Sequence, residues 1–393
     1  MPTSRESLRG LLSRATTIKA ATLLASFVLL FGLPSYSHAA RTFHSGFEMG
    51  DTIEWIDYRD NTNLVTSPVK TGSFALHLNS LANAVRPQNV GGSDIYARFS
   101  FRWAGVGPSQ AKPIVSFVGY RGTAVAILRL DPSGNFEFVD RAGTLFAEIP
   151  APPPNEWHDV SLHIVVNTSG GDLDANDVYE FRIDDGAISA STVAAGNVSL
   201  YGLTVGHSYL AGTAVPVYVD DFKVNTPAGA LNNSWPAGGG IIRLAPRADS
   251  TDPAHQSWNG TFADVDETPH DADLTTATAP GPLAAETYQH AAATSTAGEF
   301  AEAGPAALVV VVKMGGSAPA STANDLIIRS SGTDFPLAKT FTTAYRGYLR
   351  IDELDPADNQ PWTPAKLDQA EIGVRAGSFA SESNIPTVTA LNW

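Results

Sequence analysis

Two acidic segments, Phe47-Glu48-Met49-Gly50-Asp51 and Val217-Tyr218-Val219-Asp220-Asp221-Phe222-Lys223-Val224, decide the fold of the first half of this chain. The second segment has the apolar and aromatic residues of a strand, yet it carries a double Asp. Strand interiors normally exclude Asp, and a buried charge must be paired or bound to a metal. The two segments therefore predict an opening and a closing strand that lie side by side and are pinned through their carboxylates.

Glu48, Asp220 and Asp221 are the candidate ligands of a Ca²⁺ ion at this junction. Ca²⁺ takes about six to eight oxygen ligands, and carboxylates from adjoining strands can supply several of them, with backbone carbonyls completing the shell. Asp51 is a further candidate ligand. The alternative interpretation is that Asp220 and Asp221 end an edge strand in solvent and bind nothing.

The hydrophobic pattern predicts an all-β protein with two domains. Residues 41–225 alternate with period two between turns of Gly, Pro, Asp and Asn, which is typical of a β-sandwich. Residues 226–240 are rich in Pro, Gly and Asn and predict a flexible linker. Residues 241–393 predict a smaller β-sandwich with one short helix.

That helix has recognisable start and stop signals. Thr363 is a good N-cap, Pro364 follows it, and the helix is expected to run to Ile372 and end at Gly373. In the same half, residues 308–312 form an apolar run that predicts a buried strand.

Residues 1–39 have the pattern of a secretory signal peptide. A segment with four basic residues precedes an apolar run over residues 20–33, and Ser37-His38-Ala39 fits a cleavage site. The apolar run is shorter than the roughly 20 residues that span a bilayer, and no later segment is long enough, so no membrane span is expected after cleavage. The mature protein is therefore expected to be secreted, either free outside the cell or associated with its surface.

Charge and cysteine content narrow the possible partners. The signal carries four basic residues and one acid, so its removal changes the formal net charge from −15 to −18. An acidic surface of this kind repels nucleic acid and anionic lipid, and no nucleic-acid partner is expected. The chain has no Cys, so disulfides cannot stabilise it.

The first half resembles laminin-G-like and concanavalin-A-like jelly rolls, including the related carbohydrate-binding modules of secreted bacterial proteins. Four motifs carry the resemblance: residues 47–55, 72–78, 155–162 and 218–222. The resemblance implies a jelly-roll sandwich, a structural Ca²⁺ at the position of Glu48, Asp220 and Asp221, and carbohydrate binding.

The second half resembles a β-domain found in phage virion proteins and in secreted bacterial proteins. Residues 258–273 and 355–374 carry this likeness. It implies a structural role and motivates an alternative function, a subunit or decoration of an extracellular filament or of a phage-like particle.

The sequence does not contain a recognisable catalytic motif. The Glu-x-Asp-x-x-Glu pattern of jelly-roll glucanases is absent, and Glu48, Asp51 and Glu54 have a different spacing. The sequence also lacks zinc-binding His pairs and the Gly-x-Ser-x-Gly motif of serine hydrolases. We therefore expect no enzymatic activity, and a polysaccharide lyase or glycoside hydrolase on the same fold remains the alternative.

Aromatic residues next to turns are the candidate ligand-binding groups, because a ring face stacks on the apolar face of a pyranose. The aromatic candidates in the first half are Tyr58, Trp103, Tyr120, Tyr201 and Tyr209. Tyr120 and Tyr209 are preferred because turn-like residues flank them, whereas Trp103 lies in an alternating strand and is expected in the core. The leading functional hypothesis is a non-catalytic lectin-like or adhesion protein that binds a polysaccharide or a cell-surface glycan.

Overall fold

The computed structural model describes most of the chain after the predicted signal. The described residues are 40–52, 54–58, 63–78, 84–87, 90, 92–105, 107–119, 124–140, 142–166, 177–193, 200–206, 215–229, 231–266, 276–293, 307–316, 323–340, 346–377 and 386–392. Residues 1–39, which carry the predicted signal, lie outside these ranges. No helix in the described part is long and apolar enough to cross a membrane.

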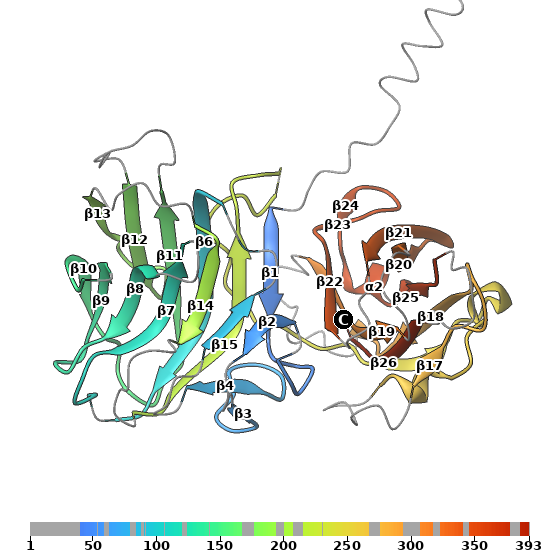
Figure 1. Ribbon diagram of the computed structural model, residues 1–393, viewed down its shortest axis with the longest axis horizontal. Helices are drawn as coiled ribbons and strands as arrows, with labels where there is room; N and C mark the ends of the chain where they lie inside the picture. Colours follow the sequence, from blue (N-terminus) through green and yellow to red (C-terminus); the bar gives the residue numbers. More distant parts are fainter. Residues whose placement is uncertain are drawn as a thin grey trace, which may run out of the picture. The chain divides into compact units, whose positions relative to one another are not determined.

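The first sheet contains both terminal strands of the first sandwich (Figure 1). Its strands are β1 (Arg41–Ser45), β3 (Asn63–Val65), β4 (Ala75–Leu78), β6 (Asp94–Trp103), β11 (His158–Val165), β12 (Asp177–Ile183), β13 (Ser189–Val193) and β15 (Val217–Asn225). Their order is β13-β12-β11-β6-β15-β4-β3, and β1 also pairs with β15. The prediction that the opening and closing strands lie side by side is thus confirmed. The residues from which the opening strand was predicted, Phe47 to Asp51, lie instead in turns and bends after β1.

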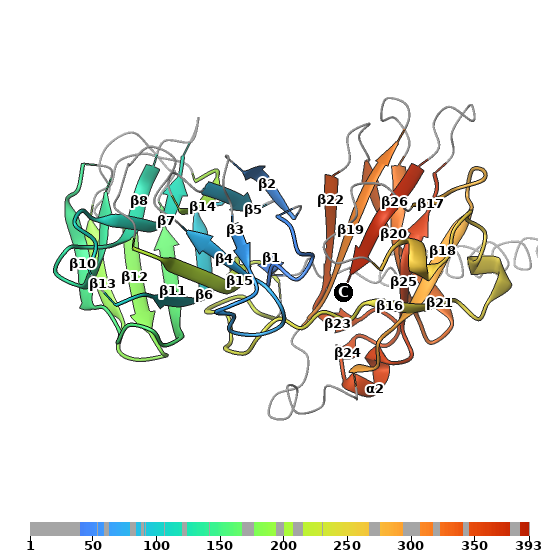
Figure 2. The same ribbon diagram turned by 90° about the horizontal axis from the view of Figure 1, so that it is seen from below.

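The second sheet packs over the first as a separate layer (Figure 2). Its strands are β2 (Trp55–Tyr58), β5 (Ala84–Pro87), β7 (Lys112–Val118), β8 (Ala124–Leu130), β9 (Asn135–Asp140), β10 (Leu145–Pro150) and β14 (Gly202–Gly206). Their order is β10-β9-β8-β7-β14-β5-β2, with antiparallel pairing throughout. Two antiparallel sheets with this strand order form the expected jelly roll.

Aromatic packing joins the first strand to the last inside this sandwich. The ring of Phe222 on β15 lies 5.6 Å from that of Phe99, 5.5 Å from that of Trp55 and 6.3 Å from that of Phe43. All four side chains are buried. Burial of an aromatic side chain is strongly favourable, so this cluster holds the two ends of the jelly roll together.

Residues 246–392 form the second set of sheets. One sheet has the order β16-β18-β25-β20-β21, and the other has the order β17-β26-β19-β22. The first comprises β16 (Pro246–Asp249), β18 (Ala285–His290), β20 (Ala323–Ser330), β21 (Thr333–Thr340) and β25 (Glu371–Arg375). The second comprises β17 (Ala277–Thr278), β19 (Leu308–Gly316), β22 (Arg346–Asp352) and β26 (Pro386–Asn392).

Short elements complete this half of the chain. They are the hairpin of β23 (Leu354–Asp355) and β24 (Gln360–Pro361), the single-turn 3₁₀ helices η2 (Pro253–His255) and η3 (Phe262–Asp264), and the α-helix α2 (Pro364–Leu367). The predicted buried strand at residues 308–312 is the start of β19, with Leu308 and Val310 in the core. The all-β prediction with one short helix is therefore confirmed.

The helix begins as predicted but ends earlier. Thr363 accepts a hydrogen bond from the backbone N–H of Lys366 and caps the helix, which ends at Leu367. Ile372 and Gly373 lie instead in β25, between β18 and β20. Glycine is required at position 373, because a Cβ atom there would stand 1.8 Å from the carbonyl oxygen of Glu286 on β18. The glycine that suggested a helix stop therefore serves close strand packing.

The segment predicted to be a flexible linker makes specific contacts with the first sheet. Asn225 donates a hydrogen bond to the carbonyl of Ser234 at 2.9 Å, and Lys223 donates to the carbonyls of Ala237 and Gly239. The flexible behaviour expected from its composition is therefore corrected for the described residues 231–240, which pack against β15.

Replacing Gly373 by Ala tests the strand packing. The added methyl would push β25 away from β18, so we expect a loss of about 1–3 kcal/mol or more in the free energy of unfolding. Gly281→Ala is the matched control, because a Cβ atom added there would meet no other atom within 4 Å. Urea denaturation of both variants gives the comparison, and equal stabilities would contradict the close approach.

Candidate functional site

Three carboxylates converge where the first strand of the sandwich meets the last. Glu48 lies in the turn after β1, and Asp220 and Asp221 lie in β15; their exposed fractions are 8%, 0% and 2%. Successive residues of a regular strand point to opposite faces. Here the register shifts between Asp220 and Lys223, and Asp221 has φ of 51°. This bulge allows both aspartates to contact the same loop, and the three predicted site residues are brought together.

That loop connects β3 to β4 and holds the carboxylates through its backbone. Asp220 accepts hydrogen bonds from the N–H groups of Lys70 at 2.8 Å and Thr71 at 3.4 Å. Glu48 accepts from the N–H groups of Ser73 at 2.9 Å and Phe74 at 3.1 Å. Residues 70–74 thus form a backbone cradle, a set of N–H groups that holds the carboxylates of Asp220 and Glu48.

Gly72 is required at the centre of this cradle. It has φ of 65°, and a Cβ atom there would stand 2.3 Å from the carboxyl carbon of Glu48. Any side chain would displace Glu48, so the glycine permits both the turn and the close approach.

Burial makes this cluster electrostatically costly. Burial, together with the charge of Asp221, raises the pKa of Asp220 to about 8 and that of Glu48 to about 7. Burial also raises the pKa of Asp221, whose Oδ2 is buried without a hydrogen-bond partner. The charges of Lys223 and Arg243 lower the pKa values of Asp221 and Glu48 and offset part of this effect. The three groups therefore hold protons, or need further positive charge when all of them are ionised.

The donor set suits Ca²⁺, because all of its atoms are hard oxygens and one buried oxygen lacks a partner. Within the described residues, no group of three or more His, Cys, Asp or Glu side chains is arranged to hold a metal ion as it stands. Calcium binding at Glu48, Asp220 and Asp221 would therefore require a rearrangement of these side chains and additional oxygens from the backbone or from water.

A fourth buried carboxylate, Glu54, lies close to this cluster and was not predicted as a site residue. It accepts a hydrogen bond from Ser45 Oγ at 2.5 Å, and Ser45 also accepts one from Trp55 Nε1 at 3.1 Å. Burial and the charge of Asp51 raise the pKa of Glu54 to about 8.

The raised pKa values predict how stability depends on pH when no divalent cation is present. A carboxyl group whose folded pKa exceeds its unfolded pKa favours folding while protonated, and this contribution is lost as pH rises through the window between the two. Each unit of difference corresponds to about 1.4 kcal/mol. In chelator, we expect the free energy of unfolding to fall between about pH 4 and pH 8 because of Asp220 and Glu48.

Asp220→Asn should flatten this dependence, because the amide does not titrate. Denaturant unfolding of both proteins at several pH values in chelator measures the difference. Parallel curves for the wild type and the variant would contradict the raised pKa.

The predicted ligand-binding residues Tyr120 and Tyr209 lie outside the described residues, so their role stays a prediction. Tyr120 comes two residues after Val118, the last residue of β7, and Val118 pairs with Gly202 at the start of β14. Tyr209 comes three residues after Gly206, the last residue of β14. The described strand ends that precede the two tyrosines in the sequence therefore lie at opposite ends of β14. Tyr201, another of the aromatic candidates, immediately precedes Gly202, at the end of β14 that pairs with Val118. Its backbone N–H donates to the carbonyl of Val118 at 2.8 Å, and the residue is 49% exposed.

The outer face of the second sheet carries a described pair of neighbouring carboxylates, because Glu148 on β10 and Glu137 on β9 are register partners. One row across its strands consists of Leu145, Val139, Ile127, Ser116 and Thr204. The nearby charged groups Arg129 and Glu137 form an ion pair at 2.7 Å. Glu137 therefore has a charged partner in Arg129, and Glu148 accepts a hydrogen bond from Asn135 Nδ2 at 2.6 Å.

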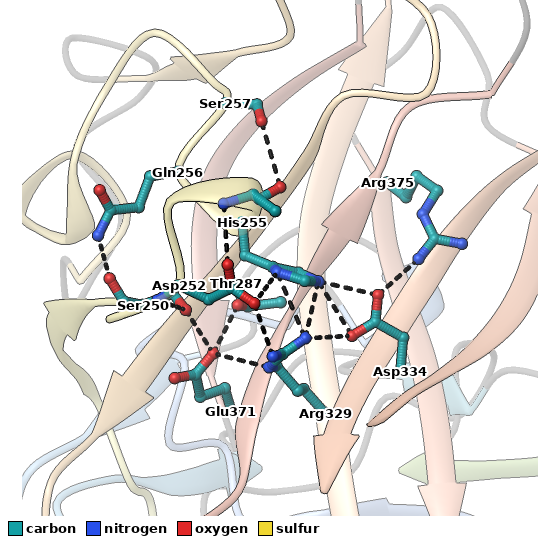
Figure 3. A network of polar contacts seen from close by, with 11 residues as sticks. Ser250, Asp252, His255, Gln256, Ser257, Thr287, Arg329, Asp334, Glu371 and Arg375 are labelled. Carbon is teal, nitrogen blue, oxygen red and sulfur yellow. Dashed lines mark hydrogen bonds and ion pairs between the residues drawn. The ribbon is translucent and has the colours of Figure 1, made fainter. Parts of the chain in front are cut away.

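A second polar cluster lies in the second half of the chain and includes His255, Arg329 and Asp334 (Figure 3). His255 Nε2 lies 2.9 Å from Asp334, and Arg329 forms ion pairs with Asp334 at 3.0 Å and with Asp252 at 2.7 Å. Arg375 also pairs with Asp334 at 2.7 Å. These groups satisfy one another, which indicates a structural network that ties η2 to β20, β21 and β25.

Asp334 is the centre of this network. Burial alone would raise its pKa, but hydrogen bonds and charge from His255 and Arg329 lower it. Its stabilising contribution is therefore present above the unfolded pKa and is lost as pH falls.

Asp334→Asn should destabilise the protein by about 1–3 kcal/mol at pH 7, because Arg329 and Arg375 lose a charged partner while partly buried. Asp358→Asn removes an exposed carboxylate that pairs with Lys366, and we expect only a small effect there. Thermal unfolding of both variants gives the comparison, and equal losses would contradict the central role of Asp334.

Comparison with known proteins gives only distant structural similarity. No protein-family model matches the sequence, and no curated protein matches it. Among solved structures, the chain is similar to the alginate lyase Aly36B, at 11% identity over 41% of this chain and 84% of the lyase, with a TM-score of 0.29. It is also similar to the cellulose induced protein Cip1, at 12% identity over 50% of this chain and 100% of Cip1, with a TM-score of 0.38.

A Trypanosoma rangeli sialidase is similar at 10% identity over 38% of this chain, with a TM-score of 0.29. The matched part is 25% of the sialidase, so the similarity covers only a fraction of that enzyme.

Proposed function

We propose that this protein is a secreted, non-catalytic carbohydrate-binding or adhesion protein. The observation that carries the proposal is the exposed Tyr201 at the end of β14, beside the strand end that leads to Tyr120. An exposed ring on a rigid strand end can stack on a sugar at little cost in conformational entropy.

Within this proposal, Ca²⁺ has a structural role. Glu48, Asp220 and Asp221 would hold it, and it would supply the positive charge that lets all three carboxylates ionise in a buried position. Its binding would stabilise the folded state by linkage, about 2.7 kcal/mol at a free concentration one hundredfold above Kd. This proposal is supported by the loop of residues 70–74, whose backbone N–H groups hold Asp220 and Glu48.

A structural subunit of a filament or particle is the second candidate, and exposed apolar residues favour it. Leu145 starts β10 and Ile188 precedes β13, and both side chains are exposed. β10 and β13 are the edge strands of the two sheets, and Ser189 Oγ donates to the carbonyl of Glu148 where they meet. Apolar residues beside sheet edges suit association with another molecule.

Glycan-array binding of the mature protein in calcium tests the leading proposal. We expect saccharide-specific binding that Tyr201→Ala weakens by about 1–2 kcal/mol, roughly five- to thirtyfold, because the stacking ring is lost. Leu283→Ala is the matched control, since this exposed apolar residue lies away from the jelly roll in sequence and sheet. A blank array from folded protein, together with concentration-dependent association, would replace the leading proposal by the structural subunit.

A further inference from the structure

Three aromatic side chains gather on the outer face of the first sheet. Tyr96 on β6 points away from the core, because its neighbours Ile95 and Ala97 lie in the core and successive strand residues face opposite sides. Its register partner is His163 on β11, and the two rings stack at 3.9 Å with an interplanar angle of 3°. The ring of Trp235 lies 5.6 Å from that of Tyr96 and 5.7 Å from that of His163, at 69° and 67° to them. The indole therefore lies across the edges of the two stacked rings.

The sheet holds the Trp235 ring in place from below. The guanidinium carbon of Arg182 on β12 lies 4.7 Å from the centre of this ring, within the range of a cation–π interaction. Tyr96, His163 and Arg182 all belong to strands of the first sheet, so the opposite face of the indole is turned away from the sheet. Trp235 is partly exposed. A ring fixed in this way can stack on a sugar with little loss of conformational entropy.

Two carboxylates border this aromatic group. His163 Nδ1 lies 2.7 Å from Glu180 Oε2, and His163 Nε2 lies 3.0 Å from Asp94 Oδ1. The other oxygens, Asp94 Oδ2 and Glu180 Oε1, have no partner within the described part of the chain, and the two side chains are 28% and 25% exposed. An ionised carboxylate only accepts hydrogen bonds, so these two oxygens suit the hydroxyl groups of a ligand.

Tyr96 and Trp235 add hydrogen-bond donors beside these acceptors. Among the described residues, the Tyr96 hydroxyl and the Trp235 indole N–H have no hydrogen-bond partner, and neither group is fully buried. Burial, together with the charges of Asp94 and Glu180, raises the pKa of Tyr96, so its hydroxyl keeps its proton at neutral pH. The group therefore offers donors, acceptors and a ring face at one place on the surface.

We propose that this group is a second saccharide-binding site, on the outer face of the first sheet, and that it binds a neutral sugar. Trp235 stacks on the apolar face of a pyranose ring. Asp94 and Glu180 accept hydrogen bonds from its hydroxyl groups, and the Tyr96 hydroxyl donates to one of its oxygens.

The charges of the site select a neutral sugar over an acidic one. Two carboxylates repel a uronate or a sulfate group, and Arg182 is already paired with Asp185 at 3.0 Å. The inference rests on the carbohydrate binding proposed above, but it does not depend on Tyr201, which precedes β14 of the second sheet. The two sites can therefore be tested separately.

Calorimetric titration of the mature Tyr201→Ala variant with soluble hexasaccharides isolates the proposed site. The probes are neutral hexasaccharides of glucose, xylose, mannose and galactose, and acidic hexasaccharides of mannuronate and galacturonate. We expect this variant to bind at least one neutral probe and neither acidic probe. Adding Trp235→Ala should weaken binding of the neutral probe roughly five- to thirtyfold, because the stacking ring is lost.

Tyr96→Phe separates binding from a structural role of the aromatic group. It keeps the ring that stacks on His163 and removes only the hydroxyl, so affinity should fall about two- to tenfold with an unchanged melting temperature. Tyr218→Phe is the matched control, because Tyr218 is the register partner of Arg102, about 20 Å along β6 from Tyr96. It should leave affinity unchanged.

The outcomes distinguish this inference from the proposed function. If Tyr201→Ala abolishes binding of every probe that the wild type binds, the second site is overturned and carbohydrate binding stands. Preference for the acidic probes, or equal affinities of the Tyr96→Phe and Tyr218→Phe variants, would also overturn the second site. A wild-type protein that is folded and binds neither these probes nor the glycan array would overturn both proposals.

Discussion

The burial of three carboxylates at the junction of the first and last strands is the constraint on which this structure depends. Ionised carboxylates in a low-dielectric interior are costly unless hydrogen bonds and a cation compensate them. The bulge at Asp220 and Asp221, the left-handed Asp221 and the backbone cradle of residues 70–74 all serve this cluster. Several irregular features of the sandwich thus have one physical cause.

The aromatic core keeps this costly arrangement in place. Phe222 follows the two aspartates directly and is buried among Phe43, Trp55 and Phe99. Its burial fixes β15 against β1 whether or not the carboxylates are charged. Hydrophobic packing therefore sets the position of the strands, and the protonation or cation binding of the cluster adjusts their stability.

The sequence predicted the jelly roll and its acidic junction because both are local patterns. Period-two alternation specifies strands, and a double Asp in an apolar strand stands out against it. Glu54 and the cradle at Thr71 and Gly72 were not predicted as parts of the site, since their roles depend on contacts between segments distant in the chain. The network around Asp334 was missed for the same reason, because its members extend from Asp252 to Arg375.

Glycine was the main source of error, because its two uses look alike in a sequence. The glycines of residues 238–240 suggested flexibility, yet Gly238 and Gly240 permit close contact of this segment with Arg98 and Thr71. Gly373 suggested a helix stop, yet it lies between two strands that approach closely. Only the packing partners distinguish a flexible glycine from one that is required for close approach.

A crystal structure of the mature protein grown in calcium would test the central claim most directly. The account predicts anomalous density for one ion, bound by oxygens of Glu48, Asp220 and Asp221 at about 2.3–2.6 Å, with backbone or water oxygens completing about six to eight ligands. Carboxylates in the same positions with no ion between them would contradict it, and protons would then have to account for the burial of this cluster.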